Sequence, residues 1–266
     1  MITIKQLTDL HGRRALITGA TGCLGRVFAH ALAQQGAELV LVDRPGSDFR
    51  SLTSELSQWS VDVQPHACDI ESQEQRQKLI DEMSAGNNPL SILVNNAAFV
   101  GTSDLSGWVV PFEQQSIETW RRAFEVNLTA AFHLCQGLAL ALRRSKGANI
   151  VNIGSIYGFL GPDWRLYEGT QMSNPAAYAA SKGGLIQMTR WLASTLAPHI
   201  RVNAISPAGI FRNQARSFVE SYEARTPMGR MANEEDFVAP LVFLASDAGR
   251  YVTGQNLIVD GGFSVW

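Results

Sequence analysis

Short runs of apolar and β-branched residues alternate with longer amphipathic stretches along the chain. Such continuously apolar runs are typical of strands in a parallel sheet that is covered on both faces. The long spacings between the runs leave room for right-handed crossover helices. The pattern therefore predicts an α/β fold with a doubly wound parallel sheet and helices on both faces. The six runs that we interpret as strands are residues 14–19, 38–43, 92–97, 149–155, 200–206 and 256–261.

Length and composition favour a single domain that covers residues 1–266. The chain has 45% hydrophobic residues, which is sufficient for a substantial core, and it shows no linker, low-complexity tract or internal repeat. The start, "MITIKQLTDLHGRR", lacks the continuous apolar core of a signal peptide, and no later segment approaches the length that spans a bilayer. We therefore expect a cytoplasmic protein without a membrane partner.

Charge and cysteine usage exclude two further kinds of partner. The formal net charge is −2 and charges of both signs are dispersed, so no basic stripe is present to bind a nucleic-acid backbone. Cys23, Cys68 and Cys135 are odd in number, far apart and without metal-ligand spacing. We interpret all three as free thiols with a packing role in a reducing compartment, and we expect no metal site.

A glycine-rich turn, "TGATGCLG" (18–25), follows the first predicted strand. Glycines in such a turn let the backbone approach a pyrophosphate, whose charge is favoured by free N–H groups at the N-terminus of a helix. A purely structural strand-to-helix turn is the alternative. The helix that begins here is indicated by apolar residues at helical spacing, namely Leu24, Val27, Phe28, Ala31 and Leu32.

Asp43 ends the second predicted strand, 18 residues after Gly25. A carboxylate at this place can accept hydrogen bonds from an adenosine ribose and would repel a 2′-phosphate, which predicts NAD in preference to NADP. An exposed aspartate at a strand end is the alternative. Arg44 could pair with a phosphate, stack against adenine or point to solvent.

The segment "YAASK" places Tyr178 and Lys182 four residues apart, on one face of a predicted helix. An ammonium group close to a phenol lowers the phenol pKa, which is ordinarily about 10. An accidental pair is the alternative, but Ser155 ends the predicted strand 149–155, where open α/β sheets bind their ligands. Three groups are then available to polarise, orient and protonate a carbonyl.

With these motifs in place, the sequence resembles the short-chain dehydrogenase/reductase family over nearly its whole length. The resemblance implies a Rossmann-type domain that transfers a hydride between a nicotinamide cofactor and a small-molecule substrate. It also implies that Ser155 binds the substrate oxygen, Tyr178 transfers its proton, Lys182 holds the nicotinamide ribose and Asn127 supports a proton relay. The motifs appear in the family's order: the glycine turn, Asp69, "NNAA" (95–98), Asn127, Ser155, "YAASK" and "SPAGI" (206–210).

The resemblance further implies a set of cofactor contacts and shows two departures from the family pattern. Cys23 replaces the middle glycine of the turn, while Gly22 offers a glycine one place earlier. After the sixth strand "PA" replaces the usual Pro-Gly and Arg212 replaces a common Thr, so backbone groups of Gly209 and Ile210 are expected to contact the cofactor. The full set of implied contacts is Gly19, Thr21, Gly22, Cys23, Leu24, Gly25, Asp43, Arg44, Asp69, Ile70, Asn95, Ala97, Tyr178, Lys182, Pro207, Gly209 and Ile210.

Within the family, the sequence is most similar to bacterial oxidoreductases of the flagellin modification protein A type. The segments that carry this resemblance include "SIYGFLGPDWRLYEG", "SPAGIFRNQ" and "VTGQNLIVDGG". It implies a role close to the synthesis of nonulosonic-acid sugars for surface glycans. A dehydrogenase of an unrelated small hydroxy compound and a non-catalytic sensor of the cofactor are the alternatives, since function transfers poorly between relatives.

Ser155 and Tyr178 are 23 positions apart, which is longer than the family's usual spacing and predicts an insertion at about 158–176. Trp164 or Tyr167 could cover the apolar face of a sugar, and Arg165, together with Arg212, could hold a carboxylate or phosphate. We therefore expect a polar, sugar-like substrate under this loop. A loose surface excursion is the alternative.

Two segments rich in apolar residues, 234–262 and a predicted helix from Ala123 to Leu142, bear on assembly. In the family, the equivalent segments form subunit interfaces, so the resemblance implies a homotetramer, with a dimer as the second choice. These residues could instead simply cover the sheet.

Overall fold

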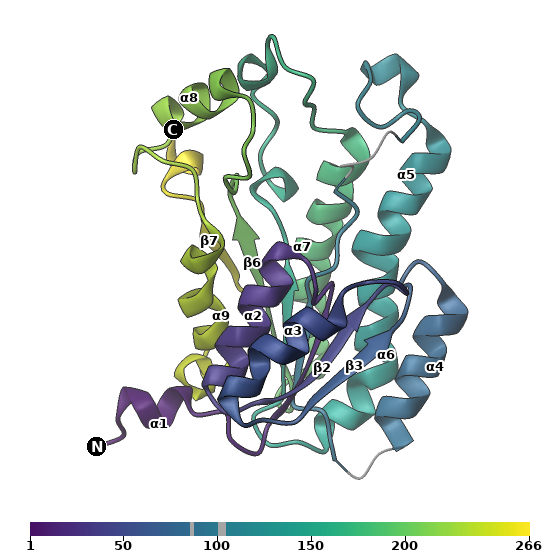
Figure 1. Cartoon of the computed structure of the whole chain (residues 1–266), viewed down its shortest axis with the longest axis vertical. Coiled ribbons are helices and arrows are strands. Elements are labelled where there is room, and N and C mark those ends of the chain that lie inside the picture. The colour runs from purple at the N-terminus through teal and green to yellow at the C-terminus, as the bar shows by residue number, and fades with distance from the viewer. Residues whose placement is uncertain (86–87, 101–104) are drawn as a thin grey trace.

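A parallel sheet with helices on both faces forms the centre of the molecule (Figure 1). This computed structural model describes residues 1–85, 88–100 and 105–266. In this part of the chain the sheet has seven strands, in the order β3-β2-β1-β4-β5-β6-β7. The predicted doubly wound α/β fold is confirmed, and the strand order reverses between β1 and β4, where such sheets bind ligands. The strands are β1 Arg14–Thr18, β2 Glu38–Asp43, β3 Val63–Ala67, β4 Ile92–Asn95, β5 Asn149–Ile153, β6 Arg201–Pro207 and β7 Asn256–Val259.

Most of the helices form one layer on each face of the sheet, while α1 and α8 lie outside these layers (Figure 1). Contacts join α2 to α3 and α9 on one side, and α4 and α7 to α6 on the other. None of the helices in the described ranges is long and apolar enough to cross a membrane. Their bounds are α1 Ile4–Thr8, α2 Cys23–Gln34, α3 Phe49–Leu56, α4 Gln73–Ala85, α5 Ile117–Phe124, α6 Ala130–Arg143, α7 Ala176–Leu196, α8 Arg216–Arg225 and α9 Val238–Ala245.

Each face of the sheet has its own hydrophobic core. Successive side chains of a strand point to opposite faces. In β1, Ala15 and Ile17 therefore pack under α2 and α9, while Leu16 packs under α4 and α6. Both sets of positions are fully buried, which explains why the central strands are apolar without alternation.

The strand β3 was not among the six runs predicted from hydrophobicity. It lies at the edge of the sheet, pairs only with β2 among the strands described, and contains Pro65 and His66. An edge strand tolerates proline and polar residues because one side of it has no ladder of hydrogen bonds to make. Its sequence consequently lacks the apolar pattern of the central strands.

The helix predicted over 123–142 is longer and less regular than expected. It begins at Ile117, where the side chain of Ser116 accepts hydrogen bonds from the N–H groups of Glu118 and Thr119. A π-helical turn at Glu125–Thr129 separates α5 from α6. Such turns are frequent at functional sites, and this one carries the buried Asn127.

Candidate active site

The glycine turn between β1 and α2 brings the helix into direct contact with the strand end. Gly19 has φ +64°, a conformation that favours glycine, and a Cβ at Gly25 would lie 2.0 Å from the oxygen of Gly19. Gly22 is the N-cap of α2 and contributes no side-chain cap, so N–H groups in the first helical turn are available to a phosphate. This cradle fits the pyrophosphate of a dinucleotide.

Cys23 is the first residue of α2 and adopts ordinary helical geometry there, so the departure from the family's glycine is sterically tolerated. Its side chain is exposed, whereas Cys68 and Cys135 are buried. The expectation that all three cysteines are packing residues is therefore wrong for Cys23. At the N-terminus of a helix that caps a ligand site, its thiol has no core to pack into.

Asp43 is held against the glycine turn. One carboxylate oxygen accepts hydrogen bonds from the N–H of Thr21 at 2.9 Å and from its hydroxyl at 2.7 Å. The other accepts from the N–H of Arg44 at 2.8 Å. The carboxylate is thus fixed beside the turn, and the oxygen that accepts from Arg44 has a further lone pair for a ribose hydroxyl.

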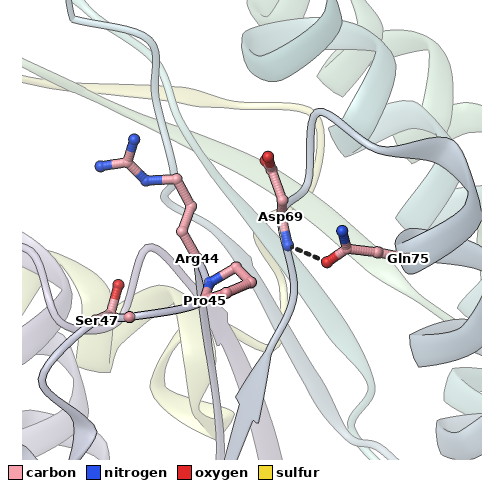
Figure 2. A pocket seen from close by; sticks show the side chains of 6 residues that line it. Arg44, Pro45, Ser47, Asp69 and Gln75 are labelled. Atoms are coloured by element: carbon pink, nitrogen blue, oxygen red, sulfur yellow. Dashed lines mark hydrogen bonds between the residues drawn. The ribbon is translucent and has the colours of Figure 1, made fainter.

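Arg44 and Asp69 follow neighbouring strands and line one cavity of about 480 Å³ (Figure 2). The side chain of Gln75 accepts a hydrogen bond from the N–H of Asp69 at 2.8 Å, and the Asp69 carboxylate accepts one from Glu71. Arg44 lines this cavity with an exposed side chain, and the three alternatives for its role stay predictions. The position fits the adenine end of a dinucleotide.

Two adjacent asparagines at the end of β4 have different roles. Asn95 is buried and donates a hydrogen bond to Asn152 at 2.8 Å, inside the sheet, so its side chain is not available to a cofactor. Asn96 donates to the carbonyl oxygens of Thr18 and Gly19 at 2.9 and 3.1 Å and thereby fixes the glycine turn. The motif "NNAA" contained this second residue, but spacing alone could not distinguish the two.

Lys182 is 2% exposed and points to the end of β5. Its ammonium donates a hydrogen bond to the carbonyl oxygen of Ile153 at 2.7 Å and lies 5.9 Å from the centre of the Tyr178 ring. Burial lowers the pKa of Lys182 from 10.5 to about 8. The helical spacing therefore does bring the two side chains to one place, as predicted.

The predicted effect of Lys182 on the phenol is not observed. Burial raises the pKa of Tyr178, and hydrogen bonding to Ser155 and the positive charge of Arg212 offset this only in part. The ammonium of Lys182 donates its hydrogen bond to the Ile153 carbonyl rather than to the phenol oxygen. In this structure Tyr178 is an acid that retains its proton at neutral pH.

Ser155 directly follows β5 and has its hydroxyl positioned by the next turn. Its oxygen accepts a hydrogen bond from the N–H of Tyr157 at 3.2 Å. The hydroxyl hydrogen remains for donation to a second oxygen. Ser155 is therefore oriented as a donor beside Tyr178.

Asn127 holds the start of α7 in place. Its amide group donates a hydrogen bond to the hydroxyl of Ser181 at 2.9 Å, and that hydroxyl donates to the carbonyl oxygen of Tyr178 at 2.9 Å. Its side-chain oxygen accepts from the N–H of Phe99 at 2.6 Å. The two polar atoms of this side chain thus join the segment after β4 to the helix that carries Tyr178.

Arg76 on α4 links the loop after β3 to the π-helical turn. It is 2% exposed and donates hydrogen bonds to the carbonyl oxygen of Ile70 and to the carboxylate of Glu125, the latter at 2.6 Å. Ile70 lies next to Asp69, and Glu125 begins the turn that carries Asn127. Hydrophobic patterning did not indicate this residue, because a buried arginine interrupts the apolar face of a helix.

Other tyrosines surround Tyr178. The hydroxyl groups of Tyr157 and Tyr167 are 2.7 Å apart, and the hydroxyl of Tyr222 accepts a hydrogen bond from the N–H of Gly209 at 2.7 Å. The Gly209 N–H was expected to contact the cofactor, but Tyr222 already accepts its hydrogen bond. The backbone of Ile210 still lies beside it, although its carbonyl oxygen accepts from Gln214 at 2.7 Å.

The two arginines considered for an anionic substrate each have a carboxylate partner. Arg165 binds Asp163 through two hydrogen bonds of 2.7 and 2.8 Å, and Arg212 contacts Glu234 at 3.1 Å. Asp163 also pairs with Arg225 on α8 at 2.7 Å. Both guanidinium groups therefore have a carboxylate partner, and the expected joint grip of Arg165 and Arg212 on a substrate anion stays a prediction.

The comparisons with known proteins agree with this geometry. A family model described as enoyl-(acyl carrier protein) reductase matches residues 19–264. The chain is 33% identical over 265 residues to a tropinone reductase homologue of Arabidopsis thaliana, covering 97% of this chain and 94% of the relative. It is 30% identical over 275 residues to galactitol 2-dehydrogenase of Rhizobium johnstonii, with full coverage of both chains.

Among solved structures, the chain is similar to a Beutenbergia cavernae protein described as an NAD(P)-dependent gluconate 5-dehydrogenase with bound NADP. The TM-score is 0.85 at 33% identity, over 97% of this chain and 99% of the other. The glycine turn, the end of the sheet and these relatives lead to one conclusion. The chain belongs to the short-chain dehydrogenase/reductase family, whose members are oxidoreductases that act on alcohols and ketones with an NAD(P) cofactor.

Proposed function

We propose that this protein transfers a hydride between NAD and the reacting carbon of a secondary alcohol or ketone on a polar, sugar-like substrate. The observation that carries the proposal is the convergence of Ser155, Tyr178 and the buried Lys182 beside the end of β5. Burying an ammonium group costs free energy, and groups with strongly perturbed pKa values cluster at functional sites.

The residues divide the work on the substrate oxygen. A bound nicotinamide would supply the hydride to the carbonyl carbon, or accept it in the opposite direction. The Ser155 hydroxyl would donate a hydrogen bond to the carbonyl oxygen, and the Tyr178 hydroxyl would give that oxygen its proton. Because the pKa of Tyr178 is raised, the proton is in place for reduction. Lys182 would hold a ribose hydroxyl and stabilise the phenolate that remains.

The preference for NAD is supported by Asp43, because a carboxylate fixed at the end of the second strand would repel a 2′-phosphate. Arg44 is the competing feature, because it lines the same cavity as Asp69 and could pair with a phosphate. The Beutenbergia cavernae relative holds NADP. We retain NAD as the proposed cofactor because the carboxylate is bound on both oxygens and the Arg44 side chain is exposed.

The sugar-like substrate is supported by relatives named for galactitol and gluconate. The resemblance to flagellin modification protein A adds the narrower proposal of a role in surface-glycan synthesis. A small hydroxy compound of another class is the second candidate. A cofactor sensor without turnover is disfavoured, since Ser155, Tyr178 and Lys182 are all present and close together.

A panel of ketoses, sugar alcohols, sugar acids and nucleotide sugars, together with small hydroxy compounds of other classes, separates these candidates. Turnover of NAD or NADH would be followed at 340 nm with the purified protein, because cofactor binding alone is expected of a sensor too. The proposal predicts at least one polyhydroxylated substrate. If the protein bound the cofactor but turned over no member of the panel, the cofactor sensor would be the remaining candidate function.

We also propose a homotetramer in the cytoplasm, with a dimer as the second choice. Exposed apolar side chains on α6, α9 and β7 support an assembly, namely Phe132, Leu140, Phe243 and Ile258. Light scattering at micromolar concentration checks this, and a monomer there would contradict it.

A further inference from the structure

A second cavity lies beside the start of α7, between residues 105–115 and residues 162–174. Its volume is about 1190 Å³. Ala176, Ala179 and Ala180 form its wall on α7, so they flank Tyr178 on the same helix. Ser155 and Tyr178 themselves are not among the residues that line it. The cavity is therefore adjacent to the proposed catalytic groups but separate from them.

The described residues that line this cavity have polar groups but no charge. Every polar side chain among its described lining residues is an amide or a hydroxyl, from Gln115, Thr170, Gln171, Ser173 and Asn174. A carboxylate or phosphate would lose its hydration here without an ionic partner, which is costly. An uncharged ligand that offers several hydroxyl groups has no such cost.

Asn174 supplies an independent sign of a ligand. The residue is 6% exposed, and neither its side-chain nitrogen nor its oxygen has a hydrogen-bond partner within the described part of the chain. Buried amides are almost always paired, because an unpaired one loses its bonds to water without replacement. A ligand with a donor and an acceptor side by side would satisfy both atoms.

Trp164, from the same segment 162–174, provides an apolar surface in this lining. Its side chain is 54% exposed although it lines the cavity, so part of the indole remains accessible. The C–H face of a sugar ring packs on such an aromatic surface while its hydroxyl groups reach amides at the edge.

We infer that this cavity binds an uncharged, polyhydroxylated ring, with Trp164 against one face and Asn174 hydrogen-bonded to neighbouring hydroxyl groups. This rests on the proposed function, since the ring would be the part of the substrate remote from the reacting carbon. It narrows the substrate class from a polar, possibly anionic compound to one whose remote ring is neutral.

Two glycosides that differ in a single group test the inference. Phenyl β-D-glucopyranoside and phenyl β-D-glucuronide share their rings, but the second carries a carboxylate in place of a hydroxymethyl group. Binding to the full chain would be measured by ligand-observed NMR, without turnover. We expect the glucoside to bind at least about tenfold more tightly than the glucuronide, equivalent to one or two hydrogen bonds.

Variants locate the binding. Trp164→Ala and Asn174→Ala should each weaken glucoside binding at least about tenfold. Trp191→Ala is the matched control, because Trp191 on α7 is similarly exposed, at 58%, but does not line the cavity. This variant should leave glucoside binding unchanged. Because Trp164 is exposed, its removal tests the site even where Asn174→Ala unfolds the chain. Equal binding of both glycosides, no binding of either, or unchanged binding by Trp164→Ala would overturn the inference.

The failure of this inference is distinguishable from failure of the proposed function. Turnover in the substrate panel with glucoside binding unaffected by Trp164→Ala would reject the cavity alone. Glucoside binding that depends on both variants, without turnover of any substrate, would reject the oxidoreductase proposal and leave the cavity as a binding site.

Discussion

Lys182 illustrates, at the scale of the residue, a conflict between stability and activity. Its ammonium is buried against one backbone carbonyl, and its pKa falls from 10.5 to about 8. Folding therefore has to bury a charge at neutral pH. The corresponding cost is roughly 3 kcal/mol, from 1.36 kcal/mol for each unit of pKa. Enzymes often retain such strain because the site requires it.

Replacing this residue should raise stability and abolish turnover. Lys182→Met is expected to increase the free energy of unfolding of the cofactor-free protein at pH 7 by up to roughly 3 kcal/mol. Between pH 8 and 10.5 the unfolded chain binds more protons at this site than the folded one, so wild-type stability rises with pH and the difference narrows. Urea unfolding at pH 7 and pH 9.5 checks this. A less stable Lys182→Met protein at pH 7 would show that the charge is not costly.

Tyr178 is expected to matter for the chemical step and little for cofactor binding. Tyr178→Phe removes the proton donor but keeps the ring, so turnover should fall about 10²–10⁴-fold. The dissociation constant of NADH should stay within about twofold, because the lost hydroxyl acts mainly in the transition state. Steady-state kinetics and fluorescence titration measure the two quantities. Near-normal turnover would refute the proposed role.

Asp43 is expected to determine the cofactor. The wild-type protein should show a higher kcat/KM with NAD than with NADP, and Asp43→Asn should raise kcat/KM with NADP at least about tenfold by removing the repulsion. Asp48→Asn is the matched control, because Asp48 is exposed nearby and Asn retains the cap that it provides for α3. Equal efficiency of the wild type with both cofactors would contradict the assignment.

At the scale of the element, helix α2 has an exposed thiol in its first turn whose reactivity can report whether a cofactor is bound there. Cys23 is exposed in its first turn, while Cys68 and Cys135 are 3% and 1% exposed. Burial raises the pKa of Cys68 to about 11 and of Cys135 to about 12, so both thiols resist alkylation. A phosphate over this turn would shield Cys23.

Iodoacetamide should consequently add one group to the folded protein, as seen by intact mass. NADH at a hundred times its dissociation constant should slow the addition roughly a hundredfold by mass action. Cys23→Ser should take up no label under the same conditions. An unchanged rate with NADH bound would mean that the cofactor does not cover the first turn of α2.

Elements with a strong apolar pattern could be predicted from sequence, and others could not. The central strands are buried on both faces and were found, while β3 is an edge strand that needs little apolar surface. The π-helical turn at 125–129 was missed because it lies within a continuous helical segment, where apolar spacing does not distinguish a π-helical from an α-helical turn. Tertiary contacts of Asn127, rather than local preference, accompany that turn.

At the scale of the whole molecule, the sequence predicted that the motif residues lie close together. It did not predict which side chains and backbone groups they contact, because many of these contacts join distant parts of the chain. Tyr178 and Lys182 share a face because of helical spacing. The direction of the Lys182 ammonium and the absence of a partner for Asn174 in the described part of the chain depend on elements distant in sequence. The pair of Arg165 and Asp163 is local, but Arg225 on α8 joins it from a distant part of the sequence. No periodicity encodes such contacts, so side-chain partners and pKa directions required the structure.

Arg76 connects the cofactor end of the candidate site, near Asp69, with the turn that carries Asn127. It is buried and joins Ile70, beside Asp69, to Glu125 in the turn that carries Asn127. A ligand that orders one end should then make ordering of the other less costly, which is positive cooperativity between cofactor and substrate. Linkage requires each ligand to tighten the other by the same factor, commonly about 5–150-fold.

This reciprocity can be measured with NADH and a competitive inhibitor of the substrate found in the panel, each titrated with and without the other. In Arg76→Met the factor should move towards one, because the connection is lost while both ligand contacts remain. Arg144→Met, which removes a surface arginine bound to the Ser84 carbonyl, should keep the wild-type factor. The buried guanidinium would thus let an occupied cofactor site prepare the protein for its substrate.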